Sequence, residues 1–308
     1  MPGFITHYTT GIEAVDKMSD NYIRELIARS NHAFLVGLQG MDIFQYTFRS
    51  KSHRSLSYRT AGSGIHNQEY AAFFNSMCEA IDKVESGQRD ACLAYLAGFL
   101  CYYAGEKTLE PYIAYRTGQR LPTKSRSSQA RRERAGVETT IDTVLLRSHF
   151  HLEPSQLNFG ALTYLSRHDA ALIGTVVRRT VRETYNCRIS NSEVASGLKA
   201  LRRSLVCVRP DRHYHRNLMA VMKNRIIYED YMTDSNDYMN AAHRPWYPYL
   251  GCMEPVTYSF EEIYQMALMH AVHLLDSLDS YVSWGMHREE LISEVIDLNP
   301  YDRVGGGD

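Results

Sequence analysis

One stretch constrains the fold of this chain more than any other, the 25 residues Cys92–Arg116, CLAYLAGFLCYYAGEKTLEPYIAYR. Its apolar residues recur at steps of three and four, beginning with Leu93, Leu96 and Leu100, which is the period of an α-helix with one buried face. A helix this apolar needs other elements around it. The sequence therefore predicts a long helix near the centre of a core.

Three polar side chains follow the same helical rhythm. Tyr102, Glu106 and Glu110 stand at i, i+4 and i+8, which places a phenol and two carboxylates on one line along the helix. Acids one turn apart repel each other unless a metal, an arginine or solvent lies between them. A solvated acidic edge is one interpretation, since helix charges usually face water. The apolar surroundings favour the other, a line of acids that faces a cleft.

Composition bounds the class of protein. The 308 residues suffice for one large domain or two ordinary ones, 44% are hydrophobic, and the formal net charge is −1. This balance indicates a globular protein without attraction to nucleic acid or anionic membranes. No apolar run reaches the roughly 18 residues of a membrane span, and the start of the chain lacks the pattern of a signal peptide. The six scattered cysteines form no C-x-x-C pair, so we expect reduced thiols and a cytoplasmic protein.

The rest of the chain is dominated by helical periodicity. Further helices are expected over residues 133–150, 154–186, 190–206, 211–230 and 259–283, with exposed loops over 49–64 and 117–132. Few segments alternate with period two. The sequence predicts an all-α fold with a single domain over residues 1–285 and a C-terminal tail over 286–308.

Several separate polar residues are candidates for a site. His7, Asp42 and His66 lie in apolar or glycine-rich surroundings, and Asp42 follows Gly40, but each alone is more often structural, Asp42 as a helix N-cap. The helix near residue 140 carries Arg134, Glu138 and Asp142 at successive i+4 steps. The chain contains no H-E-x-x-H, G-x-S-x-G or P-loop motif. Spacing alone therefore predicts only an all-α protein with a candidate acidic site.

Several segments, in order along the chain, carry a resemblance to a known family. They are MPGFITHYTTG, GLQGMDIF, GIHN at residues 64–67, AYLAGFL, EPYIAYRTG, VETTIDTVLLR and HRPWYPY. In these segments the chain resembles the bacterial zinc-dependent phospholipase C family, and in particular its leaderless members, from Met1 to about Tyr281. The resemblance implies a multi-helix phospholipase C-like fold with a central cleft. It also implies up to three zinc ions that bind a phospholipid phosphate and activate water.

The family's ligand positions are kept only in part. His7, Asp42, His66 and Glu138 match them, and Glu106 replaces an aspartate that it could imitate. These five are the metal ligands that the resemblance implies, with Asp42 assigned as the catalytic residue.

Three ligand positions are altered. Tyr102 and Glu110 replace histidines of the family, and Arg134 replaces another. A phenol with a pKa of about 10 is a poor zinc ligand at neutral pH, and an arginine cannot ligate a metal because it stays protonated. An arginine between two acids can, however, take the electrostatic place of a metal. We therefore expect a salt-bridge cluster at this position and a reduced set of one or two zinc ions, or none.

Three functions remain open from the sequence. The first is a phospholipase C-like protein with a reduced metal cluster, weak or absent phosphodiesterase activity and a cleft used for binding a phospholipid or another phosphodiester. The second is an active metal-dependent phosphoric diester hydrolase acting on such a molecule. The third is a structural or interaction protein whose 22 tyrosines contact a partner.

Three structural expectations follow from these readings. The helices containing residues 92–104 and 134–148 should pack side by side. His7, Asp42, His66 and Glu106 should converge on one point. Arg134 should pair with Glu110, Glu138 or both.

Overall fold

The computed structural model describes residues 3–44, 67–118, 128–207, 228–298 and 300–301. The α-helices are α1 Phe4–Lys17, α2 Tyr22–Arg29, α3 Asn31–Gly37, α5 Asn67–Asp82, α6 Asp90–Arg116, α7 Ser128–Phe150, α8 Phe159–Leu162, α9 Arg167–Tyr185, α10 Asn191–Cys207, α12 Phe260–Ser283 and α13 Arg288–Asp297. Short 3-10 helices lie at η1 Gly40–Phe44, η2 Ser86–Gln88 and η3 Pro154–Gln156. Within these ranges the β pairing is limited to one isolated bridge, Trp246 with Val256. The described chain is all-α, as predicted.

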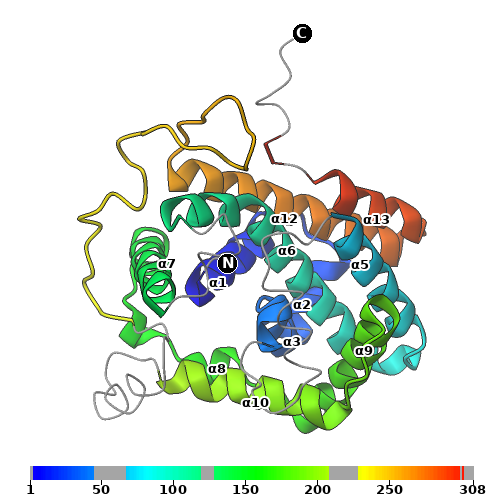
Figure 1. Ribbon diagram of the computed structural model, residues 1–308. Coiled ribbons are helices and arrows are strands. Elements are labelled where there is room, and N and C mark those ends of the chain that lie inside the picture. Colours follow the sequence, from blue (N-terminus) through cyan, green and yellow to red (C-terminus); the bar gives the residue numbers. More distant parts are fainter. Residues whose placement is uncertain (1–2, 45–66, 119–127, 208–227, 299, 302–308) are drawn as a thin grey trace.

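Helix α6 lies at the centre of the molecule (Figure 1). Every residue from Ala91 to Gly105 is buried, so this segment is covered on all sides rather than on the one face that its periodicity suggested. Its most extensive neighbours are α12 and α3. A helix that is apolar all round has to be buried all round, because any face left in water would lose the hydrophobic stabilisation.

The contact between α3 and α6 depends on two glycines. A Cβ atom on Gly98 would lie 2.2 Å from the backbone oxygen of Phe34, and one on Gly37 would lie 2.3 Å from that of Tyr95. Both distances are too short for real atoms. The two backbones can approach this closely only because neither position carries a side chain.

Helix α12 begins where the sequence predicts. Ser259 and Glu262 form a capping box, in which the Glu262 backbone N–H donates to the Ser259 hydroxyl and the Glu262 carboxylate accepts from the Ser259 backbone N–H. The helix then follows α6 and packs against α1 as well.

Other expected elements differ in detail. The segment 154–186 is divided into η3, α8 and α9, and residues 233–258, for which no helix is predicted, are irregular. The segment expected to be a C-terminal tail contains α13, which buries Leu291 and Val295 against α5 and α12. The tyrosine of α6 at position 103 donates a hydrogen bond to the Val295 carbonyl at 2.7 Å, which ties α13 to the core. Most of the expected helix 211–230 and of the loops 49–64 and 117–132 lies outside the described residues.

A search of the described helices for one long and apolar enough to cross a membrane finds none.

Candidate functional site

Four elements contribute the predicted site residues. His7 lies on α1 and Asp42 on η1, while Tyr102, Glu106 and Glu110 lie on α6. Arg134 and Glu138 come from α7. His66 lies outside the described residues, so its predicted place in the site stays a prediction.

Helices α6 and α7 touch over a short stretch only, and α1 packs against both. The expectation that they run side by side is therefore wrong over most of their length. The helices meet near their site residues because α1, which carries His7, is packed against each of them.

The start of α1 is fixed by a carboxylate from α7. Asp142 is fully buried and accepts hydrogen bonds from the backbone N–H groups of Ile5 and Thr6, at 3.1 and 2.8 Å, and from the Thr6 hydroxyl at 2.6 Å. The Tyr228 hydroxyl donates to Asp142 Oδ2, the oxygen that also accepts from Ile5, at 2.6 Å. Asp142 thus caps α1 from another helix and sets the position of His7 one turn later. Burial raises the pKa of this carboxyl to about 6 despite the four donors.

Spacing along the chain does not reveal this role of Asp142. Its i+4 spacing from Glu138 was visible, but the N-terminus that it caps is more than 130 positions away in the chain. Local spacing carries no information on such a contact.

Tyr102 links His7 to Asp42. Its ring lies against the imidazole of His7 with 4.6 Å between the ring centroids, and its hydroxyl donates to Asp42 Oδ1 at 3.2 Å. Gly40 has a φ of +41°, and a Cβ there would lie 2.2 Å from the Tyr102 ring. The glycine thus allows the turn that carries Asp42 to approach the phenol.

His7 and Glu106 form the least satisfied pair of the site. His7 Nε2 lies 3.2 Å from Glu106 Oε1, yet the angles do not make a hydrogen bond. Neither these two atoms nor His7 Nδ1 has a hydrogen-bond partner among the described residues, although His7 is 1% exposed. Burial lowers the pKa of His7 to about 4, so its imidazole is neutral at pH 7. A neutral imidazole beside a carboxylate is the form in which histidine binds metals.

Three further carboxyl groups, those of Asp42, Glu110 and Glu138, gather around this pair and form a cluster of four with Glu106. Burial is the main cause that raises the pKa values of Asp42, Glu106, Glu110 and Glu138, and the repulsion between neighbouring carboxylates raises them further for Asp42, Glu106 and Glu110. Such a cluster favours any bound cation, because a cation would relieve both effects at once.

Arg134 supplies one positive charge to this cluster, as predicted. Its Nε donates to Glu138 Oε1 at 2.6 Å within α7, and its Nη2 donates to Glu110 Oε2 at 2.5 Å across to α6. The arginine opposes the rise in the pKa of Glu138. The three side chains are 11–17% exposed, so this ion-pair cluster is largely shielded from water.

The phenol of Tyr102 is kept neutral. Burial and then the nearby carboxylates of Asp42 and Glu106 raise its pKa well above the ordinary value. A neutral phenol donates its proton to Asp42 and is unsuited to ligate zinc.

The described residues do not present a complete metal site. No three histidine, cysteine, aspartate or glutamate side chains of the described ranges are placed to hold one ion together. The structure brings His7, Asp42 and Glu106 into one buried neighbourhood, and their assignment as ligands remains a prediction. Imidazole nitrogens and carboxylate oxygens are of the types that bind zinc. The buried atoms of His7 and Glu106 that lack hydrogen-bond partners are also suited to bind an ion.

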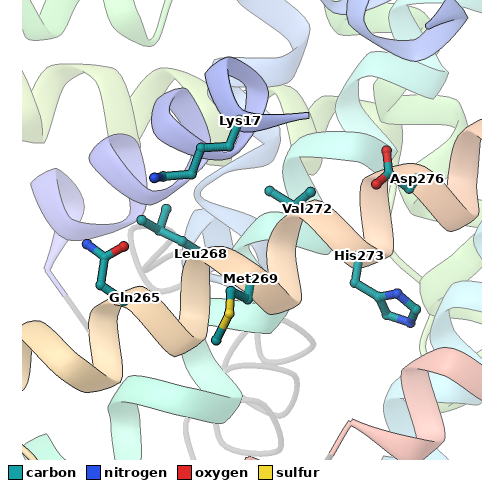
Figure 2. A pocket seen from close by; sticks show the side chains of 7 residues that line it. All are labelled: Lys17, Gln265, Leu268, Met269, Val272, His273 and Asp276. Carbon is teal, nitrogen blue, oxygen red and sulfur yellow. The ribbon is translucent and has the colours of Figure 1, made fainter. Parts of the chain in front are cut away.

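A separate surface pocket of about 370 Å³ lies between α1 and α12 (Figure 2). It is lined by Lys17, Gln265, Leu268, Met269, Val272, His273 and Asp276. None of these residues belongs to the His7 neighbourhood. The predicted cleft is therefore not this pocket.

Comparison with protein-family models, with curated proteins and with solved structures finds no match to this chain. The function is accordingly argued from the site.

Proposed function

We propose that this chain is a phospholipase C-like protein whose site holds one divalent metal ion, zinc in the first place, and binds a phosphodiester with weak or absent hydrolysis. The observation that carries the proposal is the pair of His7 and Glu106. Buried polar atoms that lack partners cost stability, and natural proteins keep them mainly where a ligand or ion completes them. The resemblance seen in the sequence supports zinc as that ion.

The residues of this site suit a single cation. His7 would bind through a ring nitrogen and Glu106 through a carboxylate oxygen. Asp42 lies in the same neighbourhood, but in the structure it is not placed to share one ion with these two side chains. When bound, the ion would act as a Lewis acid toward a phosphate oxygen. Tyr102 would hold Asp42 in place through its hydroxyl, as it does in the structure.

Two features support weak hydrolysis. Arg134 occupies the space between Glu110 and Glu138, where the family resemblance implies another metal. Tyr102 stands as a neutral donor where that family has a ligand. Without metal ligands at these two positions, the site could still bind an anion next to one metal ion. It would lack the several metal ions that together activate water for hydrolysis.

Metal analysis of the purified protein by plasma mass spectrometry tests the proposal. After zinc loading and desalting we expect about one equivalent in the parent chain and a loss of at least about tenfold in affinity in His7→Ala and in Glu106→Gln. The matched controls are His168→Ala and Glu133→Gln, which alter exposed residues of the same types. Three equivalents of zinc would contradict the reduced cluster, and no zinc above the level of the variants would contradict the metal site.

The affinity for zinc should rise with pH. The pKa values of Glu106 and Asp42 are raised, so protons compete with the metal over a range that extends above the usual acid range of carboxylates. Calorimetric titration at several pH values and in buffers of different protonation enthalpy would show tighter binding and fewer released protons as pH increases. Affinity that is the same from about pH 5 to 8 would exclude these carboxyls as ligands.

An active hydrolase is distinguished by turnover. Multiple turnovers on bis(p-nitrophenyl) phosphate that require zinc and disappear in Asp42→Asn would favour the hydrolase over the binding protein. Binding of a phosphodiester without turnover is the result that the proposed function expects.

A further inference from the structure

The net charge of −1 conceals an uneven distribution. Between residues 167 and 203, which cover α9 and most of α10, the chain carries eight basic and three acidic side chains. The basic ones are Arg167, Arg178, Arg179, Arg182, Arg188, Lys199, Arg202 and Arg203. Of the acids, Asp169 and Glu193 accept hydrogen bonds from Ser166 and Ser190, and Glu183 lies 3.6 Å from Arg182 Nε, so basic side chains remain in excess, eight against three. This region is therefore strongly basic toward solvent.

Three of the four arginines of α9 share one side of the helix. Arg167, Arg178 and Arg182 lie within about 60° of one another at 100° per residue, and Arg179 lies about 60° beyond Arg182. Arg167 and Arg182 are exposed, whereas Arg178 and Arg179 are half-buried.

Helix α10 repeats this arrangement. Lys199, Arg202 and Arg203 are exposed, while Val194, Leu198 and Leu201 are buried. Each helix therefore presents a solvent face that is basic and an inner face that is apolar.

The two solvent faces form one surface. Helices α9 and α10 pack against each other, and the Asn191 side chain at the start of α10 joins them. It accepts a hydrogen bond from Arg178 Nε at 2.9 Å and donates one to the Thr175 hydroxyl at 3.2 Å. Since Thr175 and Arg178 belong to the basic side of α9, the basic sides of the two helices adjoin. We call this surface the α9–α10 face.

The acidic residues lie elsewhere in the molecule. Residues 259–298, which cover α12 and α13, carry eight acidic side chains and a single basic one, Arg288. In Figure 1, α12 and α13 run along the upper edge and α10 along the lower edge. Among the described residues, these two regions therefore carry opposite net charges, and a basic surface is attracted to a negatively charged one.

We propose that the α9–α10 face docks on an anionic phospholipid bilayer. Its basic side chains are dispersed over two helices among small and aliphatic residues such as Ala171, Thr175 and Ser196. Mobile lipid headgroups can gather under dispersed charges, because a bilayer sets no fixed spacing. Single-stranded nucleic acid, by contrast, is bound with aromatic platforms between the basic residues. Near this surface the exposed ring of Tyr164 has the Arg202 guanidinium over it, 5.4 Å from the ring centroid, and no exposed phenylalanine, tyrosine or tryptophan side chain lies between the basic residues within the described parts of α9 and α10. The observations favour the bilayer, and this inference stands independently of the proposed metal site.

For docking on a membrane, the local charge of the α9–α10 face matters more than the net charge of the protein. A net charge near zero predicts no preference for anionic membranes, and the separation of charge in the fold supplies that preference. Lys and Arg near a bilayer surface each add to the attraction. Charges that lie more than a Debye length of about 8–10 Å from that surface are largely screened.

Sedimentation with lipid vesicles tests the proposal on the full chain. We expect binding to vesicles of phosphatidylcholine with about 30% phosphatidylglycerol to be at least about tenfold tighter than to pure phosphatidylcholine, and to vanish at about 0.5 M salt. The triple variant Arg182→Glu, Lys199→Glu, Arg203→Glu should lose at least about tenfold in affinity.

The matched control reverses three exposed arginines elsewhere, Arg29→Glu, Arg132→Glu and Arg244→Glu, and leaves the net charge equal to that of the test variant. It should keep most of the binding. Circular dichroism on both variants checks that they are folded. Equal loss in both variants, equal binding to neutral vesicles, or no binding to anionic vesicles would each overturn the proposal. Tighter binding to a DNA duplex than to anionic vesicles would assign the face to nucleic acid and overturn it as well.

Discussion

At the scale of single residues, the site combines one satisfied charge cluster with one unsatisfied pair. Arg134 holds Glu110 and Glu138 through short hydrogen bonds, whereas His7 and Glu106 face each other at 3.2 Å without one. The difference follows from chemistry. The guanidinium of Arg134 has enough N–H donors for two carboxylates. The neutral imidazole of His7 is poorly aligned with Glu106, so the facing atoms of both side chains lack a hydrogen bond.

Replacing Arg134 should be costly. Arg134→Ala leaves two largely buried carboxyl groups beside each other, and we expect the free energy of unfolding at pH 7 to fall by about 3–5 kcal/mol. The measurement is urea unfolding followed by circular dichroism. Arg132→Ala, an exposed neighbour on the same helix, is the control and should stay within about 0.5 kcal/mol of the parent.

The variant Arg134→His extends this prediction. If the arginine stands in place of a metal, the histidine variant should be unstable alone and should regain stability when zinc is supplied. A parent-like melt of Arg134→Ala would show that the ion-pair cluster contributes little.

At the scale of elements, close helix packing places the site residues. The α3–α6 contact depends on Gly37 and Gly98, and η1 with Asp42 follows α3 directly in the chain. The position of Asp42 beside Tyr102 is therefore a consequence of how closely α3 approaches α6.

Two glycine substitutions separate packing from helix propensity. Gly98→Ala should lower the free energy of unfolding by at least about 2 kcal/mol, because its Cβ meets the backbone of Phe34. Gly136→Ala, inside α7 with no atom within 4 Å of the new Cβ, should raise it by about 0.5–1 kcal/mol, because alanine favours the helix. Thermal and urea unfolding of both variants measures this. Similar effects of the two would mean that the close contact does not control stability.

At the scale of the whole molecule, a histidine joins three helices. His149 of α7 places Nδ1 2.8 Å from Glu13 of α1 and Nε2 3.0 Å from Glu261 of α12. The Tyr264 hydroxyl also donates to Glu13, at 3.2 Å. Sequence patterns do not predict this junction, because its members are more than 100 positions apart in the chain.

Removing His149 should weaken the packing of α1, α7 and α12 against one another. We expect His149→Ala to lower the free energy of unfolding by about 1–3 kcal/mol, through lost hydrogen bonds to partly buried carboxylates. His168→Ala, at an exposed position of α9, should change it by less than about 0.5 kcal/mol. Hydrogen exchange should show faster opening of α1 in the first variant alone. Unchanged exchange in α1 would contradict a joining role for His149.

The sequence by itself determined what depends on neighbours along the chain. Helical periodicity predicted the all-α class and the helix over residues 259–283, and the i, i+4 spacing predicted the pair of Arg134 with Glu138. The line of acids on α6 also came from spacing alone. These features are local, because a helix repeats every 3.6 residues whatever packs against it.

Only the tertiary structure decided what depends on distant neighbours. Burial of α6 on all sides, the cap that Asp142 places on α1 and the charge separation between the α9–α10 face and the α12–α13 helices all join parts of the chain that no periodicity relates. The lowered pKa of His7 and the raised pKa of Glu106 belong to this group as well. Burial is their main cause, and burial is set by which helices meet, not by the residues next to them in the chain.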